Sequence, residues 1–314
     1  MEHEKLNKVI EVAKLYYLLD YTQNDIAKKL GISRPTVSRL LQLAKSEGIV
    51  QIKVKDQSEN IEILSSKIEQ KFNLKKAIVV PIPQYEDHVI KSHLGEKTAR
   101  YLEEIVKDGD VIGVTWGTTI YNVAVELREK SLKDVKVVQL KGGVSHSAKH
   151  TYASEILYLF GRAFNTAPIN LPLPAIVDHV VVKQAMEADR HIKKVLEVGK
   201  KSSIAVFTCG PVEQNSLLFQ LGYFTDEELQ MIYSKAVGDI CSRFFDENGD
   251  VCIDSLNERT LGLPLSNFKE KEFSILVAGG PKKINAIHGA LTGKYANVLV
   301  TDEYTAQFLL DLEK

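Results

Sequence analysis

Residues 22–41 carry the pattern that most constrains this chain, because they predict two short helices that meet at a glycine. Thr22 with Asp25 three residues later is typical of a helix start, where a hydroxyl and a carboxylate satisfy free backbone N–H groups. Gly31 can adopt the left-handed conformation that ends a helix. Ser33 then predicts the N-cap of a second helix. The stretch therefore predicts a helix-turn-helix.

The two predicted helices and a third one upstream each have one apolar face. Apolar residues recur at helical spacing on one side of three segments: Leu6, Val9, Ile10, Ala13, Tyr16 and Tyr17 upstream, then Ile26, Ala27 and Leu30, and finally Val37, Leu40, Leu41 and Ala44. Three such faces can pack together into a small core. Gly48 and the alternation over residues 49–54 suggest a wing strand after the helices.

The polar face of the second helix has the chemistry of a major-groove reader. Arginine can bind guanine O6 and N7 in a fork, glutamine can pair with adenine, and Ser or Thr can bind phosphate or base. The candidate DNA-binding residues are Thr22, Ser33, Arg34, Pro35, Thr36, Ser38, Arg39 and Gln42. Such residues are ordinary on any surface helix, and some helix pairs only mediate protein contacts. The agreement of caps, turn, apolar spacing and outward face favours DNA.

Charge is unevenly distributed along the 314 residues. Residues 1–54 hold nine Lys/Arg against six Asp/Glu, a net charge of +3, whereas the whole chain carries −1. A modest basic excess is enough for DNA binding when an oligomer presents several heads. The sequence shows no signal peptide, lipidation motif or apolar run of spanning length, so we expect a cytoplasmic protein without membrane contacts.

The cysteines indicate neither a metal site nor a disulfide framework. Cys209, Cys241 and Cys252 are scattered, odd in number and without metal-ligand spacing, so we expect reduced structural thiols. No other pattern calls for a metal or a cofactor. The length suggests two domains.

A polar stretch at residues 56–60 interrupts the apolar patterns, and we place the domain boundary there. The predicted domains are a DNA-binding domain over residues 1–56 and an effector-binding and oligomerisation domain over residues 57–314. Ile61, Leu64, Ile68 and Phe72 then recur at helical spacing. The helix they predict could lead into the second domain or pair with its own copy.

Short apolar strands alternate with helices through the rest of the chain. The predicted strands are residues 76–81, 110–115, 135–140, 203–208, 273–278 and 297–301, and the predicted helices are residues 86–107, 118–130, 151–164, 180–198, 283–293 and a C-terminal one. This alternation argues for a mostly parallel sheet with helices on both faces. The predicted fold class is therefore α/β, a winged head plus a larger doubly wound domain.

Three glycine-containing loops follow predicted strands, and ligands bind at that end of such sheets. Gly117 permits close backbone approach, and Thr118 and Thr119 open a helix whose N-terminus suits a phosphate. The other two loops place Lys141 and Lys283 at the same edge. A glycine–threonine turn can be a plain helix cap, and lysines near strand ends are usually only solvated. The convergence of three loops favours an anion site, although no dinucleotide-binding GxGxxG motif is present.

Four segments resemble the SorC family of bacterial sugar-responsive regulators: Ser33–Leu41, Gly113–Thr119, Gly238–Asp246 and Ala278–Lys283. The resemblance covers nearly the whole chain. Within the family, residues 139–146 and 291–297 look most like members that repress deoxyribonucleoside operons in bacilli.

The resemblance implies a winged DNA-binding head, an effector domain similar in fold to phosphosugar isomerases, and an oligomer, either a dimer or a tetramer. Its implied partners are operator DNA and a phosphosugar inducer, deoxyribose 5-phosphate. The implied phosphate ligands are Gly117, Thr118, Thr119 and Lys283, and Asp239 would accept hydrogen bonds from sugar hydroxyls. The candidate effector-binding residues are therefore Gly117, Thr118, Thr119, Lys141, Gly142, Gly143, Asp239 and Lys283.

Lys141 prompts a sharper hypothesis. Deoxyribose 5-phosphate has an open-chain aldehyde, and a desolvated lysine amine can condense with it to a Schiff base. The amine pKa must fall from about 10.4 for this, and burial beside other lysines lowers it. The alternative is that Lys141 only hydrogen-bonds the ligand.

Three other functions remain open. The regulator could respond to a different sugar phosphate. A phosphosugar isomerase or aldolase would need a second acid or base, which the sequence does not identify, and it would have no use for the head, so we expect no enzymatic activity. An interaction protein whose N-terminal helices only dimerise would not need the outward face of Arg34, Arg39 and Gln42.

Overall fold

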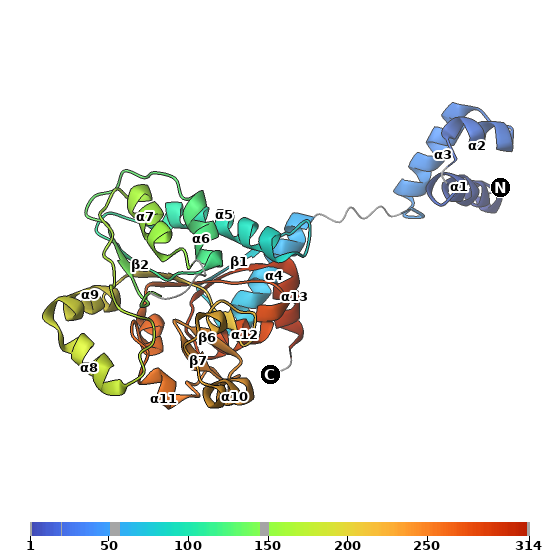
Figure 1. Cartoon of the computed structure of the whole chain (residues 1–314). Coiled ribbons are helices and arrows are strands. Elements are labelled where there is room, and N and C mark those ends of the chain that lie inside the picture. The colour runs from blue at the N-terminus through green and yellow to red at the C-terminus, as the bar shows by residue number, and fades with distance from the viewer. Residues whose placement is uncertain (1, 20, 51–56, 145–150, 313–314) are drawn as a thin grey trace. The chain divides into compact units, whose positions relative to one another are not determined.

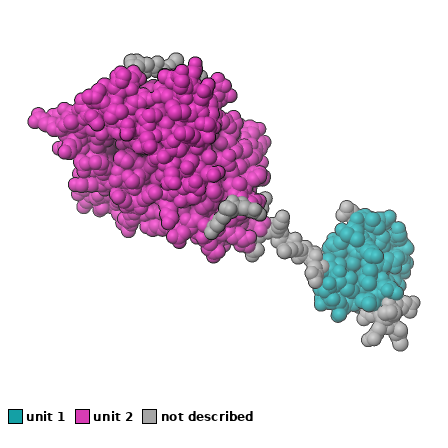
Figure 2. All heavy atoms as spheres, turned by 90° about the horizontal axis from the view of Figure 1, so that it is seen from below, with its two compact units in different colours: residues 1–57 teal, residues 58–314 magenta. Residues whose placement is uncertain are grey.

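The computed structural model of the chain describes residues 2–19, 21–50, 57–144 and 151–312. These fall into two compact units, residues 1–57 and 58–314, which Figure 2 shows in teal and magenta. Each unit has its own hydrophobic core. Within the described ranges, no helix combines the length and the apolar character needed to cross a membrane.

The first unit is a bundle of α1 (Glu2–Tyr17), α2 (Gln23–Leu30) and α3 (Arg34–Ser46). The predicted caps are confirmed. The Thr22 hydroxyl accepts a hydrogen bond from the Asp25 N–H, and the Ser33 hydroxyl accepts one from the Thr36 N–H, each at 3.3 Å. Gly31 has φ +63°, the left-handed conformation that ends α2. Local signals thus fix the turn between the two helices.

The inward faces of α2 and α3 are also confirmed, with Ile26, Val37 and Ala44 fully buried. One prediction for α1 is wrong. Leu6 is 42% exposed, whereas Val9, almost one turn later, is buried. The predicted wing strand over residues 49–54 lies largely outside the described residues. Residues 145 and 146, which end the segment 139–146 of the family resemblance, lie outside them as well.

The second unit is built on a six-stranded parallel sheet in the order β1-β9-β8-β4-β2-β3. Its strands are β1 (Lys76–Val80), β2 (Val111–Val114), β3 (Lys136–Gln139), β4 (Ile204–Phe207), β8 (Phe273–Val277) and β9 (Val298–Asp302). The chain leaves β2 toward one edge and continues from β4 toward the other. The topological switch point therefore lies between β2 and β4.

Helices cover both faces of this sheet, as Figure 1 shows. One core lies under α5 (Asp87–Ile105), α6 (Thr118–Glu126) and α7 (Ala153–Ala163), and the other lies under α4 (Gln57–Phe72), α12 (Ile284–Thr292) and α13 (Glu303–Asp311). Successive side chains alternate between the cores, so Val137 of β3 joins the first core and Val138 the second. The doubly wound α/β prediction is confirmed.

Two predicted helices are wrong in their extent. The helix predicted over residues 118–130 ends at Glu126, because Leu127 is extended with ψ 134°. Residues 180–198 form two helices, α8 (Val180–Ala188) and α9 (Arg190–Lys200). Asp189 breaks the helix with ψ 133°, and its carboxylate accepts hydrogen bonds from the N–H groups of His191 and Ile192. The side chain therefore acts as the N-cap of α9 instead of continuing α8.

A small antiparallel sheet was not predicted. It consists of β5 (Gly210–Pro211), β6 (Gly238–Ile240) and β7 (Arg243–Phe245), and it packs beside the carboxyl ends of the main strands. Its strands have two or three residues each, too few for a periodic signal. The other elements that the sequence did not indicate are α10 (Asp226–Lys235), α11 (Asp254–Asn257) and the 3-10 turns η1 (Phe219–Leu221), η2 (Leu265–Glu270) and η3 (Pro281–Lys283).

Candidate functional site

The outward face of α3 is free to bind a partner. Arg34, Arg39 and Gln42 are exposed, and Ser38 is partly exposed. Neither arginine forms a hydrogen bond or ion pair with another residue that the structure describes. Their guanidinium groups are therefore available for base edges or phosphates.

The hydroxyl groups at the helix starts are already engaged. Thr22 donates to the Asp25 carboxylate at 2.6 Å, and the Ser33 and Thr36 hydroxyls are hydrogen-bonded at 2.8 Å. Pro35, exposed in the first turn of α3, has no N–H to donate. Of the eight candidates, the two arginines, Ser38 and Gln42 have the most donor and acceptor capacity left for DNA.

A cavity of about 600 Å³ opens at the carboxyl ends of β2 and β4, at the switch point of the sheet. It is lined by residues from the strand ends, from the small sheet and from residues 213–220. Six of the eight predicted effector residues line it: Gly117, Thr118, Thr119, Lys141, Asp239 and Lys283. Residues more than 160 positions apart in the sequence thus meet around one space.

One end of the cavity is suited to an anion. Gly117, with φ +130°, precedes α6, whose first turn has no side-chain cap for its N–H groups. The Lys283 amine lies 3.1 Å from the Thr208 hydroxyl and 3.4 Å from the Thr119 hydroxyl. Burial lowers the pKa of Lys283, so an anion that replaced the lost hydration would stabilise its charge. A helix N-terminus and a cation therefore face the same point.

Lys141 is buried against the indole of Trp116. The residue is 6% exposed, and its amine lies 3.7 Å from the centre of that ring. The Trp116 Nε1–H donates to the Gly142 carbonyl at 2.7 Å, which fixes the ring. Burial lowers the pKa of Lys141, although Asp239 and Cys241 oppose the shift. At a given pH, a larger fraction of the Lys141 amine is therefore neutral and nucleophilic than for a surface lysine.

Asp239 occupies β6, where it is 6% exposed. Its carboxylate accepts a hydrogen bond from the Ser242 N–H at 3.0 Å. Burial raises its pKa, while Lys141, the Ser242 N–H and Lys283 favour the charged form. A Cβ on the neighbouring Gly210 would lie 2.2 Å from the carboxylate, so the glycine makes room for it. The small sheet thus places an acceptor beside the two lysines.

Gly142 and Gly143 do not line this cavity. A Cβ on Gly142 would lie 2.2 Å from the Pro174 carbonyl, and the Gly143 N–H donates to the Leu173 carbonyl at 2.7 Å. Both residues therefore hold the chain after β3 against residues 171–175. They lie outside the lining of this cavity, and their contact with an effector stays a prediction.

Several cavity residues were not predicted. Thr208 and Cys209 follow β4, and a fourth strand end was a signal that could have identified them. Trp116 also lines the cavity, directly before the predicted Gly117. Burial raises the pKa of Cys209 and of Cys241 to about 12, so both thiols are neutral. The three cysteines are free.

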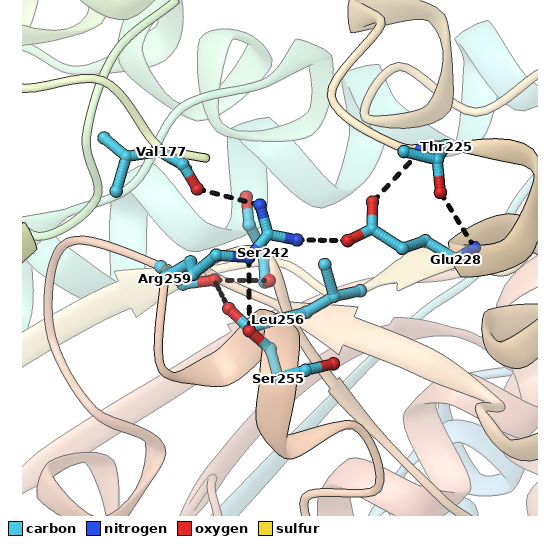
Figure 3. Close-up of polar contacts among 8 residues, drawn as sticks. Val177, Thr225, Glu228, Ser242, Ser255, Leu256 and Arg259 are labelled. Carbon is cyan, nitrogen blue, oxygen red and sulfur yellow. Dashed lines mark hydrogen bonds and ion pairs between the residues drawn. The ribbon is translucent and has the colours of Figure 1, made fainter. Parts of the chain in front are cut away.

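Residues 213–220 form one wall of the cavity, and Figure 3 shows how the chain after them is anchored. The Thr225 N–H donates to the Glu228 carboxylate at 3.0 Å, and the Glu228 N–H donates to the Thr225 hydroxyl at 3.3 Å. Glu228 also pairs with Arg259, which donates to the Val177 carbonyl at 2.9 Å. The start of α10 is thereby tied to two other segments.

Comparison with known proteins agrees with both units. The family model described as "Putative sugar-binding domain" matches residues 56–311, and "Crp-like helix-turn-helix domain" matches residues 9–67. The deoxyribonucleoside regulator of Bacillus subtilis is 51% identical over 99% of each chain, and the sorbitol operon regulator of Klebsiella pneumoniae is 31% identical over 98% of each. The crystal structure of full-length SorC from Klebsiella pneumoniae superposes with a TM-score of 0.74 at 29% identity, over 97% of this chain and 98% of that one.

Proposed function

We propose, since this chain belongs to the SorC family of transcriptional regulators and combines a DNA-binding head with a sugar-binding domain, that it represses deoxyribonucleoside catabolism genes until deoxyribose 5-phosphate binds. The observation that carries the proposal is one cavity that holds the buried Lys141, the half-buried Lys283 and a helix N-terminus. A phosphorylated aldehyde has a phosphate for the helix N-terminus and Lys283, and a carbonyl group for Lys141. The name of the Bacillus subtilis relative supports the choice of sugar.

The phosphate binds at Gly117, Thr118, Thr119 and Lys283 in this proposal. Backbone N–H groups at the start of α6 donate to its oxygens, and the α6 dipole favours its negative charge. The Lys283 amine, now hydrogen-bonded to two threonine hydroxyls, supplies the opposite charge. A phosphate there relieves the cost of burying that amine.

Lys141 captures the aldehyde end of the sugar. Its neutral amine attacks the C1 carbon, a proton passes to the carbonyl oxygen, and loss of water leaves a carbon–nitrogen double bond. The atoms balance as amine plus aldehyde giving Schiff base plus water. Asp239 accepts hydrogen bonds from sugar hydroxyls, and its charge stabilises the protonated Schiff base.

Arg34, Ser38, Arg39 and Gln42 contact the operator from α3. Ligand binding must favour an arrangement of heads with low operator affinity, and a near-complete switch needs roughly 5.5 kcal/mol of differential affinity. In a dimer or tetramer, ligands bound in several cavities can together supply that free energy. The linkage is reciprocal, so operator DNA must weaken sugar binding by the same factor.

Two alternative functions differ from this proposal, one in the ligand and the other in the class of protein. Another sugar phosphate with a free aldehyde would satisfy the same cavity, and the relatives include a regulator of a sorbitol operon. An aldolase or isomerase would use Lys141 for turnover, but the relatives are regulators and the head has no role in such chemistry. We therefore expect the sugar phosphate to be recovered unchanged.

Chemical trapping tests the proposal. The full chain is incubated with deoxyribose 5-phosphate, reduced with borohydride and analysed by peptide mass spectrometry. We expect one reduced sugar phosphate on Lys141, and none on the Lys141→Arg variant. Noncovalent binding without an adduct would remove the Schiff base but keep the effector. Failure of deoxyribose 5-phosphate to bind at all would refute the proposed ligand.

A further inference from the structure

Lys91 lies near the start of α5 and lines the effector cavity, although the phosphate site described above does not use it. Its side chain is 20% exposed, and its amine pairs with the Asp87 carboxylate at 2.6 Å. Asp87 begins α5 and also lines the cavity, but its side chain is 75% exposed. A further cation thus reaches the cavity wall, held by a partner that lies mostly in solvent.

The packing of α5 on α6 places Lys91 beside the start of α6. Both helices follow parallel strands of one sheet, so both begin at the cavity edge and run in the same direction, side by side in Figure 1. They are in close contact at Gly95, because a Cβ there would clash with the Asn122 carbonyl. Lys91 and Thr118 each lie four residues earlier, one helical turn closer to the cavity. Lys91 is therefore level with the N-terminus of α6.

The start of α5 also contacts the loop that carries Lys283. A Cβ on Gly280 would lie 3.5 Å from the side chain of Ile90, and the Lys283 N–H donates to the Gly280 carbonyl at 3.1 Å. Burial lowers the pKa of Lys283, the charge of Lys91 lowers it further, and Asp87 opposes the shift. Two lysine charges and the N-terminus of α6 thus gather at one end of the cavity.

This gathering of positive charge matches the charge of a phosphate monoester. Such a group carries about −1.5 to −2 at pH 7. The N-terminus of α6 is equivalent to about half a positive charge, so together with Lys283 it supplies at most about +1.5. A second lysine covers the remainder. Asp87 is a weak counterion for it, because water screens an ion pair with an exposed carboxylate.

We infer that Lys91 is a second cationic ligand of the phosphate and that it exchanges the Asp87 carboxylate for the phosphate when the effector binds. This inference rests on the proposed function and adds one residue to its phosphate site. A lysine amine has three N–H donors on a flexible stem, so rotation of the side chain can carry it from one anion to the other. Asp87 competes with the phosphate, and an anion of higher charge displaces it.

Two variants test the inference, because they should act in opposite directions. Lys91→Met removes the cation, Asp87→Asn removes its competitor, and calorimetry measures the affinity of the full chain for inorganic phosphate and for deoxyribose 5-phosphate. We expect Lys91→Met to weaken the binding of both ligands roughly 5- to 30-fold. Asp87→Asn should strengthen both about 2- to 5-fold.

Arg100→Met is the matched control. Arg100 pairs with Glu96 at the same spacing on α5, but neither residue lines the cavity. Phosphate affinity of this variant should stay within about twofold of the parent. All three variants should unfold close to the temperature of the parent without ligand, since an exposed pair four residues apart contributes little to stability.

Phosphate affinity of Lys91→Met within about twofold of the parent would overturn the inference and leave the proposed function intact. Weaker binding in both Lys91→Met and Asp87→Asn would show that the pair only holds the start of α5, and would also overturn it. Asp87→Asn with no gain in affinity would contradict the exchange of partners. The inorganic phosphate series tests Lys91 whichever sugar binds, so a parent that binds phosphate but not deoxyribose 5-phosphate would refute the proposed effector alone.

Discussion

The amine of Lys141 lies 3.7 Å from the centre of the Trp116 ring, and the same indole donates to the carbonyl of Gly142, the residue after the lysine. The ring therefore holds both the side chain and the backbone of this position. Aromatic contact removes water from the amine while the side chain stays in the cavity. Reactivity of Lys141 follows from that placement.

Adduct formation at Lys141 should depend on pH in a defined direction. The amine is protonated and unreactive below its pKa, and burial lowers that pKa from the ordinary value of 10.5. The rate of borohydride-trapped adduct should therefore rise with pH and reach half its maximum below pH 10.5. Mass spectrometry of samples quenched across a pH series measures it. A midpoint at or above 10.5 would contradict the assigned environment.

Phosphate affinity should depend on Lys283 and much less on its neighbour. Lys283→Met should lose about 1.5–3 kcal/mol of binding free energy for inorganic phosphate, because a charge-assisted hydrogen bond disappears. Lys282→Met is the matched control, since that lysine is 66% exposed in an ion pair with Glu213. Its loss should stay below about 1 kcal/mol. Calorimetry compares the two variants, and equal losses would remove Lys283 from the phosphate site.

A methyl group on Gly210 should displace the carboxylate of Asp239. The added Cβ would lie 2.2 Å from that carboxylate, so either the side chain or the small sheet must shift. Gly210→Ala should weaken sugar phosphate binding about 10-fold or more while inorganic phosphate binding changes little. Gly143→Ala is the control, because its Cβ would meet nothing closer than the Leu173 carbonyl at 3.9 Å. If both variants bind the sugar like the parent, Asp239 is not a sugar ligand.

DNA binding should depend on Arg39. Arg39→Ala should cost roughly 1–3 kcal/mol of operator affinity and relax base preference if it reads a guanine. If it binds phosphate, all DNA sequences should weaken alike, with a shallower salt dependence. Lys45→Ala, at the exposed last turn of α3, is the control and should have a smaller effect. Unchanged operator affinity in Arg39→Ala would exclude this residue from the interface.

The sequence predicted best the features whose causes lie within a few residues. The caps at Thr22 and Ser33 and the turn at Gly31 depend on hydrogen bonds to the next three residues, so the pattern contains them. The parallel sheet was predictable because its strands are short apolar runs between helices. The end of α8 was not, since Asp189 is the only break signal there and no glycine or proline interrupts the helical pattern over residues 180–198.

The site was predictable in part. Gly117, Lys141 and Lys283 follow predicted strands, and parallel strands end at one edge, so their convergence follows from topology. Asp239 came only from the family resemblance, because β6 is too short to show a pattern. The wall of residues 213–220 depends on contacts of Leu218 and Glu228 with distant segments, which no local signal reports.

Operator affinity with and without the sugar tests the central claim most directly. Fluorescence anisotropy would measure binding of the full chain to DNA upstream of a deoxyribonucleoside operon, titrated with deoxyribose 5-phosphate. The account predicts that saturating sugar phosphate weakens operator binding, and that Lys141→Arg and Lys283→Met blunt this response without changing affinity in the absence of sugar. Identical operator affinity at every sugar phosphate concentration would contradict it.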